Sequence, residues 1–166
     1  MGAVLRRAAC ALLVAWVVAP AASARVDDAR GLGFLWPADG SLSSPFGPRA
    51  GGFHPGIDIG SLQDLTVRAA SSGRVTATGA LMGYEGYGYV VILDIGGGLT
   101  TVYAHLARPI ARIGALVARG DMIGIAGCTG FCMGTHLHFE LREHGHAVDP
   151  MSLFPLGYTA SLFQGG

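Results

Sequence analysis

The sequence contains no lysine, and only 13% of its 166 residues are charged. Its 11 arginines are matched by 11 acidic residues, so the formal net charge is zero. A nucleic-acid-binding domain normally carries a clear basic excess, and nucleic acid is therefore not an expected partner. With 51% hydrophobic residues, the chain also lacks the composition of a disordered protein.

Long apolar runs are scarce as well. The main one lies at the start of the chain, where Arg6 and Arg7 precede the apolar segment 8–18 and the small residues 22–24. This segment is shorter than the roughly 20 residues that span a bilayer. A basic start, a short apolar core and a small-residue site predict a secretory signal peptide over residues 1–24. We therefore expect export to the periplasm, the extracellular space or the cell wall, with no stable membrane span after cleavage.

The chain has only three cysteines, and two of them, Cys128 and Cys132, lie close together beyond the signal. An exported protein meets an oxidising compartment in which such a pair can form a local disulfide. A thiolate metal site would normally need a second pair nearby. We expect a disulfide.

No segment beyond the signal shows a helical period over three turns, whereas glycine is abundant, with 27 residues. Short apolar runs separated by glycine predict an all-β fold of mostly antiparallel strands, with few or no helices. The expected organisation is a polar lead-in (25–33), one domain (34–155) and a C-terminal tail (156–166). The strand candidates are 73–79, 87–94, 99–106, 122–126 and 136–141, with a glycine turn at 96–98 joining two of them.

Histidine is the residue type that points to chemistry. On a strand, His136 and His138 face the same side, while Leu137 and Phe139 face the other and can enter the core. Neutral imidazole is the commonest protein ligand for metals. An isolated pair of this kind also fits two exposed polar residues on a strand.

The remaining histidines give weaker signals on their own. His54 and Asp58 share a face if the chain between them is extended, although most such pairs are solvated surface groups. His105 ends an apolar strand and carries almost no local signal. His144 and His146 flank a glycine in a polar segment, and we expect both at the surface.

Taken in order, the motifs resemble the lysostaphin/LytM-type peptidoglycan endopeptidases, the β-lytic zinc metallopeptidases. The similarity extends from about Trp36 to Phe154. Each motif is common, but the ordered set is specific. The motifs are Trp36-Pro37, Ser44-Pro45-Phe46-Gly47-Pro48-Arg49, His54-Pro55-Gly56-Ile57-Asp58, Gly73-Arg74-Val75, Tyr103-Ala104-His105-Leu106, Thr129-Gly130, His136-Leu137-His138-Phe139-Glu140 and Val148-Asp149-Pro150.

The resemblance implies a LytM-like fold with an open groove and one Zn²⁺ bound by His54, Asp58 and His138. It implies that His105 and His136 line the site as catalytic residues, with their individual roles left open. The implied activity is hydrolysis of peptide bonds in peptidoglycan cross-links or bridges, so that the partners are stem or bridge peptides. The alternative is a non-catalytic module of the same fold that binds peptidoglycan or activates an amidase.

Two local features depart from the family pattern. The segment between Arg49 and His54 is short and supplies no tyrosine to assist an oxyanion. The cysteine pair lies in the loop that leads into the His136–His138 strand. A disulfide there would tether that loop, and we hypothesise that its reduction loosens the site.

Overall fold

The computed structural model describes residues 34–154. The expected signal peptide, lead-in and tail lie outside the described residues, as does the last residue of the expected domain. Within the described range the fold is all-β, as predicted, and its only helical elements are two short 3-10 turns. The elements are β1 (Ser41–Ser44), β2 (Gly47–Arg49), β3 (Gly52–His54), β4 (Ile57–Gly60), β5 (Thr66–Arg68), β6 (Gly73–Ala80), η1 (Glu85–Tyr87), β7 (Tyr89–Gly96), β8 (Leu99–Pro109), β9 (Leu116–Val117), β10 (Met122–Ala126), β11 (Leu137–Glu143), β12 (His146–Val148) and η2 (Pro150–Leu153).

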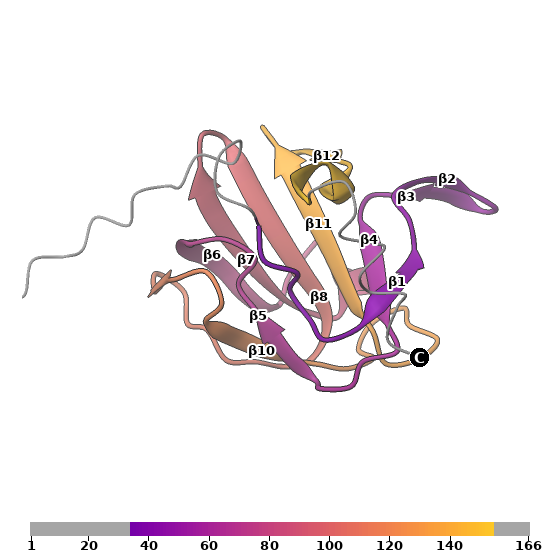
Figure 1. Cartoon of the computed structure of the whole chain (residues 1–166), viewed down its shortest axis with the longest axis horizontal. Helices are drawn as coiled ribbons and strands as arrows, with labels where there is room; N and C mark the ends of the chain where they lie inside the picture. Colours follow the sequence, from indigo (N-terminus) through magenta and orange to yellow (C-terminus); the bar gives the residue numbers. More distant parts are fainter. Residues whose placement is uncertain (1–33, 155–166) are drawn as a thin grey trace, which may run out of the picture.

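The main sheet is antiparallel, with the strand order β1-β4-β11-β8-β7-β6-β9. Figure 1 labels all of these strands except β9. β7 and β8 form the expected hairpin around residues 96–98. β2 and β3 pair only with each other, and this hairpin projects beyond the β1–β4 edge of the sheet (Figure 1). His54, the last residue of β3, thus stands at the base of this hairpin, just before β4.

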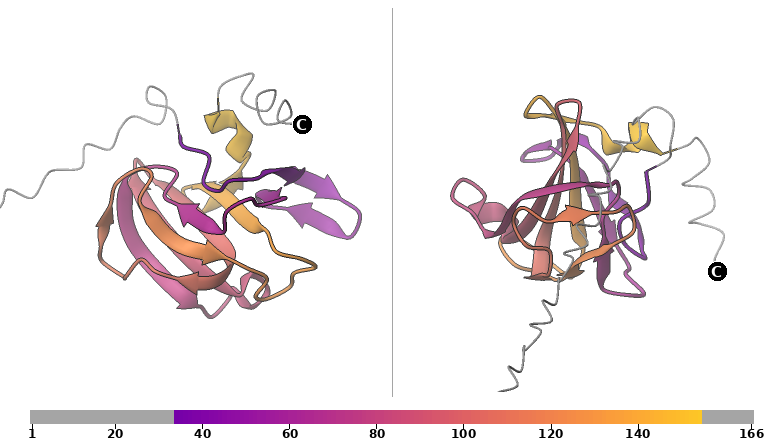
Figure 2. Two further views of the ribbon diagram at one scale, coloured as in Figure 1. Left: turned by 60° about the horizontal axis from the view of Figure 1, so that its bottom comes forward. Right: turned by 90° about the vertical axis from the view of Figure 1, so that its left-hand side faces the viewer.

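The hydrophobic core lies between the long strands and a short layer made by β5 and β10, which crosses them (Figure 2). β10 joins the two parts because it pairs with β5 on one side and with β8 on the other. Fully buried side chains come from both parts, including Val67 and Ile123 from the short layer and Leu93, Tyr103 and Phe139 from the long strands. This core fixes the strands that carry the site.

The predicted strands are confirmed, with shifts at their ends. The 87–94 strand begins at Tyr89, because residues 85–87 form the turn η1. The 136–141 strand begins at Leu137, and His136 instead makes an isolated bridge with Gly127. His144 and His146 are exposed, as predicted. Between residues 34 and 154, no helix has the length and apolar character needed to cross a membrane.

Candidate metal centre and groove

Asp58 and His138 face each other across β4 and β11. The antiparallel register pairs Asp58 with His138, Ile57 with Phe139 and Ile59 with Leu137. The apolar pairs are fully buried in the core. Because side chains alternate along a strand, Asp58 and His138 are held together on the opposite face.

His54 reaches the same point from the end of the β2–β3 hairpin. Pro55 and Gly56 then turn the chain into β4. Gly56 lies so close to β11 that an added Cβ would be 2.4 Å from the Phe139 carbonyl oxygen. The glycine therefore allows the close approach that brings His54 and Asp58 to His138.

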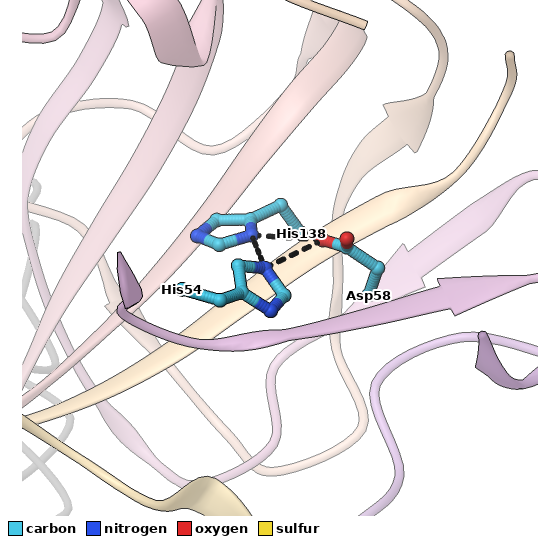
Figure 3. A group of neighbouring side chains, drawn as sticks. All are labelled: His54, Asp58 and His138. Atoms are coloured by element: carbon cyan, nitrogen blue, oxygen red, sulfur yellow. Dashed lines mark hydrogen bonds and ion pairs between the residues drawn. The ribbon is translucent and has the colours of Figure 1, made fainter. Parts of the chain in front are cut away.

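Three potential ligand atoms converge at this point (Figure 3). The Nε2 atom of His54 lies 3.2 Å from Oδ1 of Asp58 and 3.1 Å from Nδ1 of His138. Nδ1 of His138 lies 2.9 Å from the same Oδ1 atom. The edges of this triangle are close to the roughly 3.3 Å expected between ligands of a tetrahedral Zn²⁺ with bonds of about 2.0–2.1 Å.

The hydrogen bonds of the two histidines make their converging nitrogens acceptors. Nδ1 of His54 donates to the Pro45 carbonyl oxygen at 2.7 Å, which leaves the lone pair on Nε2. Nε2 of His138 donates to the Glu140 carboxylate at 3.0 Å, which leaves the lone pair on Nδ1. Two lone pairs and a carboxylate oxygen therefore face one another. This donor set fits a divalent cation such as zinc.

The electrostatics of the metal-free centre follow from the same contacts. Burial would raise the pKa of Asp58, but the hydrogen bond and charge of His138, together with His54 and His136, lower it overall. Burial would lower the pKa of His138, but its hydrogen bonds to Asp58 and Glu140 raise it overall. Asp58 is thus held as a carboxylate, and His138 is the member of the triangle that binds a proton more readily than an ordinary histidine.

His105 enters the site through an irregularity in β8. Regular alternation would point His105 into the core with Tyr103, but His105 has a left-handed backbone with φ of 58°. The β7–β8 pairing shifts register between Tyr103 and Leu106, and the β10–β8 pairing shifts again between Leu106 and Arg108. A bulge of this kind re-aims a side chain, so that Leu106 enters the core and His105 turns toward His138 and His136.

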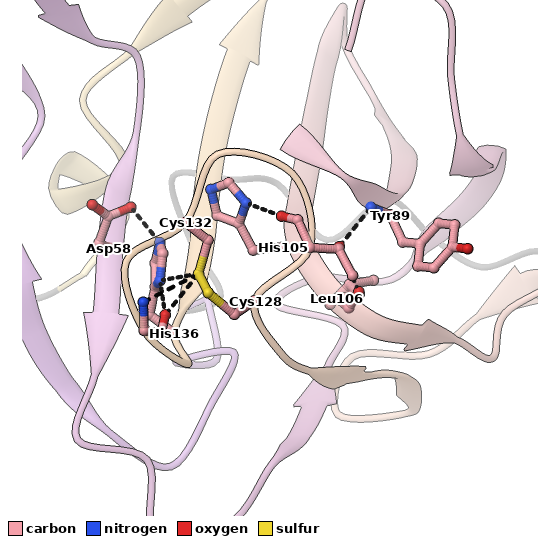
Figure 4. Close-up of a disulfide and its surroundings, with 9 residues drawn as sticks. Asp58, Tyr89, His105, Leu106, Cys128, Cys132 and His136 are labelled. Atoms are coloured by element: carbon pink, nitrogen blue, oxygen red, sulfur yellow. Dashed lines mark hydrogen bonds and ion pairs between the residues drawn. A yellow bond between two sulfur atoms is a disulfide. The ribbon is translucent and has the colours of Figure 1, made fainter. Parts of the chain in front are cut away.

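The segment 128–136, which contains both cysteines, holds the rings of His105 and His136 in place (Figure 4). Nδ1 of His105 donates to the Thr129 carbonyl oxygen at 2.8 Å, and Nδ1 of His136 donates to the Gly134 carbonyl oxygen at 2.8 Å. Each ring thereby keeps Nε2 as an acceptor, and that of His136 lies 3.6 Å from Oδ1 of Asp58. Burial lowers the pKa of His105, which its bond to Thr129 only partly offsets.

The two cysteines of this loop are joined. Cys128 and Cys132 form a disulfide with their Cα atoms 5.3 Å apart. The loop is also pinned to the sheet, because the Thr129 hydroxyl donates to the Leu106 carbonyl and accepts from the Tyr89 amide. Thr129, the acceptor of His105, therefore lies inside the cross-linked ring, and Gly134, the acceptor of His136, lies just beyond Cys132.

Sequence reasoning missed the residues behind His138. Glu140 is fully buried and accepts hydrogen bonds from His138, Arg142 and Tyr87. Its spacing of two residues from His138 placed it on the same strand face, which was a usable signal. No local signal could connect Tyr87, because it is 53 residues away from Glu140.

All five predicted side chains line one groove of about 510 Å³. The exposed side chains of Phe131 and Met133 form part of its wall, and Tyr87 lines it from η1. A tyrosine is therefore present in the groove, although its hydroxyl is bonded to Glu140 rather than free. Arg49 also lines the groove, with Nη1 4.0 Å from Oδ2 of Asp58.

Comparison with known proteins identifies the family of this chain. Residues 52–150 match the profile of peptidase family M23. The chain is 37% identical over 118 residues to the DD-carboxypeptidase/endopeptidase Mpg of Neisseria meningitidis, a match that covers 68% of this chain and 26% of Mpg. It is 33% identical over 120 residues to the murein hydrolase activator NlpD of Escherichia coli, covering 72% of this chain and 31% of NlpD.

Among solved structures, the catalytic domain of lysostaphin from Staphylococcus simulans superposes with a TM-score of 0.60 at 30% identity. That match covers 68% of this chain and 90% of the lysostaphin domain. The chain therefore belongs to peptidase family M23, and the predicted resemblance to lysostaphin-type proteins is confirmed. This family is zinc-dependent. The chain matches about a quarter to a third of the length of Mpg and NlpD.

Proposed function

We propose that this protein is an exported zinc-dependent endopeptidase that hydrolyses peptide bonds in peptidoglycan cross-links or bridges. The observation that carries the proposal is the convergence of three ligand atoms beside two further imidazoles that are not part of the triangle. His54, Asp58 and His138 would hold the metal. His105 and His136 would act on the substrate from the neighbouring wall of the groove.

The chemistry follows from the state of each nitrogen. Zinc, when bound, supplies the positive charge that acidifies a water molecule and polarises the scissile carbonyl. One of the two imidazoles accepts the proton of that water on Nε2 as oxygen attacks the carbonyl carbon, and passes it to the leaving amine as the C–N bond breaks. The other, when protonated, donates a hydrogen bond to the developing oxyanion. The backbone acceptors of Thr129 and Gly134 hold both rings in orientation.

A second function has a specific observation in its favour. The similarity to NlpD, a murein hydrolase activator, raises the hypothesis of a non-catalytic module that binds peptidoglycan or activates an amidase. Such a module has no need for the complete set of three ligand side chains and two free imidazoles. The presence of all five side chains around one groove therefore supports the peptidase.

The test is digestion of purified peptidoglycan by the zinc-loaded protein. We expect release of new amino termini, which a chelator abolishes and added zinc restores. His105→Ala and His136→Ala should each lower the rate by about 10²–10⁴-fold, as removal of a general acid–base group does, while bound zinc stays stoichiometric. His144→Ala, which changes an exposed histidine, is the matched control and should digest at the wild-type rate.

Two outcomes contradict the proposal. Amino-terminal release that survives the chelator or His105→Ala would reject the zinc mechanism. No release from walls of several cross-link chemistries, together with stimulation of an added amidase, would favour the activator. Mass spectrometry of the fragments identifies the bond that is cut.

A further inference from the structure

A buried carboxylate lies directly behind the metal centre. His138, Glu140 and Arg142 alternate along β11 and therefore share one face of the strand. Glu140 is fully buried, with 0% of its side chain exposed. A buried carboxylate is costly unless hydrogen bonds and an opposite charge compensate it, and here three donors do so.

The three donors come from different parts of the molecule. Nε of Arg142 donates to Oε2 of Glu140 at 2.6 Å. The hydroxyl of Tyr87, in η1, donates to Oε1 at 2.5 Å, and Nε2 of His138 donates to the same Oε1 at 3.0 Å. Arg142 is held in turn, because its Nη1 donates to the Tyr84 hydroxyl at 2.6 Å.

These contacts determine which nitrogen of His138 carries the proton. An ionised carboxylate only accepts hydrogen bonds, so the nitrogen that faces Glu140 must carry hydrogen. Arg142 and Tyr87 fix the plane of the carboxylate from two directions. The Nδ1 atom of His138 is therefore left bare, and it is the atom that points at Nε2 of His54 and Oδ1 of Asp58.

The arrangement also sets the angle of the ring. The Tyr87 ring packs edge-on against the His138 ring, with centroids 5.3 Å apart and planes at 84°. The same residue thus contacts the imidazole from the groove side and holds its carboxylate partner. A rotation of the His138 ring would break the bond to Glu140 and lose this packing.

We propose that Glu140, held by Arg142 and Tyr87, is a positioning residue that sets the tautomer and orientation of His138 for metal binding. The inference rests on the zinc site proposed above. It extends the site from the groove to a chain of side chains that begins at Tyr84 and ends at the metal ligand. Partners of this kind behind a metal ligand typically contribute 10–100-fold to affinity.

Glu140→Gln is the sharpest variant because it keeps the shape and removes the charge. The NH₂ group of the new amide can face either Arg142 or His138. If it faces Arg142, two donors oppose each other; if it faces His138, the amide oxygen can still accept from Arg142. The orientation in which NH₂ faces His138 offers that ring a donor. It therefore favours the tautomer with hydrogen on Nδ1, which blocks metal binding at that atom. Tyr87→Phe removes a single hydrogen bond and leaves the ring packing. Glu143→Gln makes the same chemical change at an exposed position of the same strand and is the matched control.

The first measurement is the zinc dissociation constant, obtained by competition with a chromophoric chelator. We expect about a 10–100-fold increase for Glu140→Gln, a several-fold increase for Tyr87→Phe and no change for Glu143→Gln. The second is long-range ¹⁵N–¹H correlation of the metal-free protein labelled on histidine. At alkaline pH, where the ring of His138 is neutral, it should carry hydrogen on Nε2 in the wild type and in Glu143→Gln, and shift toward Nδ1 in Glu140→Gln.

The outcomes separate this inference from the proposed function. A wild-type protein that binds no zinc overturns the proposed function itself. Wild-type protein that binds zinc, with Glu140→Gln matching both its affinity and its His138 tautomer, overturns only the positioning role. If melting of the metal-free Glu140→Gln variant shows that it does not fold, Tyr87→Phe decides, and wild-type zinc affinity in that variant overturns the inference.

Discussion

Arg49 is the one arginine or lysine among the described side chains that line the groove, and it contributes a positive charge there. Among the described residues, it is the only arginine that lines the groove, and it lies beside the single lining carboxylate, Asp58. With a divalent metal bound, the zinc, Asp58 and Arg49 together carry a positive charge. We therefore expect the groove to favour a peptide with a free carboxylate close to the scissile bond.

Arg49→Gln should lower kcat/KM for such a substrate by roughly 10–100-fold, since a hydrogen bond to a charged group contributes about 1.5–3 kcal/mol. The measurement is cleavage of paired synthetic muropeptides, one with the carboxylate and one amidated. The amidated peptide should lose less than threefold (about 0.6 kcal/mol). Arg108→Gln removes an exposed arginine away from the groove and is the control. Equal losses for both peptides would show that Arg49 acts on Asp58 instead.

The left-handed backbone at His105 is the residue-scale feature that the sequence could not reveal. A histidine in this conformation costs of order 1–3 kcal/mol, and nothing in Tyr103-Ala104-His105-Leu106 signals it. Simple alternation predicts the opposite face for this side chain. From the sequence, His105 is assigned to the site only because of the resemblance to known peptidases. The bulge is the physical reason why its side chain reaches the groove.

At the scale of elements, the loop from Gly127 to His136 positions two histidines without supplying a metal ligand. Its carbonyl oxygens accept from His105 and His136, whereas His138 lies within β11. Opening the disulfide should therefore affect turnover more than metal binding. For so small a loop the entropic contribution to stability is roughly 2 kcal/mol.

Reduction with a phosphine, or replacement of both Cys128 and Cys132 by serine, should lower kcat by roughly tenfold, since small displacements of a catalytic group cost up to about 10²-fold. The zinc dissociation constant should change less than threefold, which is less than about 0.6 kcal/mol. A phosphine is preferred because thiols bind zinc. The double-serine variant should be insensitive to the reductant. Unchanged turnover after complete reduction, verified by thiol titration, would contradict this prediction.

Gly56, at the junction between β3 and β4, is the subject of a second prediction at the scale of elements. Gly56→Ala would place a Cβ 2.4 Å from the Phe139 carbonyl oxygen and 2.9 Å from Cγ of Glu140. Because the nearest atom belongs to the backbone, β4 and β11 must move apart, and we expect a loss of about 1–3 kcal/mol in the free energy of unfolding. Zinc affinity should fall as well, since Asp58 and His138 lie on these two strands.

Urea denaturation of the metal-free proteins measures this loss. Gly134→Ala is a suitable control for stability, because nothing lies within 4 Å of its added Cβ. Its free energy of unfolding should stay within about 0.5 kcal/mol of the wild type. A Gly56→Ala protein as stable as Gly134→Ala would show that the approach of β4 to β11 is not required.

For the whole molecule, the sequence predicted the long strands and the class of fold because glycine turns and apolar alternation are local signals. β6, β7, β8, β10 and β11 all correspond to predicted strands. The shortest strands, such as β9 and β12, have only two or three residues and carry no period. The convergence at the site depends on register between β4 and β11 and on contacts such as Tyr87 with Glu140, which only the assembled fold determines.

Because zinc binding is coupled to folding, the stability of the whole molecule should depend on pH. In the metal-free protein the pKa of His138 is raised above its ordinary 6.5, because hydrogen bonds to Asp58 and Glu140 outweigh the effect of burial. A raised pKa means that protonated His138 stabilises the metal-free fold fully below the ordinary value, and that this contribution is lost as pH rises through the raised value. Asp58, whose pKa is lowered, stays ionised over the same range.

The stabilisation that zinc gives has the opposite pH dependence: it grows as pH rises, because in the proposed site zinc binds the unprotonated Nδ1 atom of His138. The difference between the Tm with excess zinc and the Tm with chelator should therefore be largest above neutral pH and shrink as pH falls through the histidine range. Calorimetry at pH 8, 7, 6 and 5 measures it, and His144→Gln, which changes an exposed histidine, should follow the same curve. A constant difference across these values, or zinc that stays stoichiometric at pH 4, would mean that protons do not compete for His138 and that the metal is bound elsewhere.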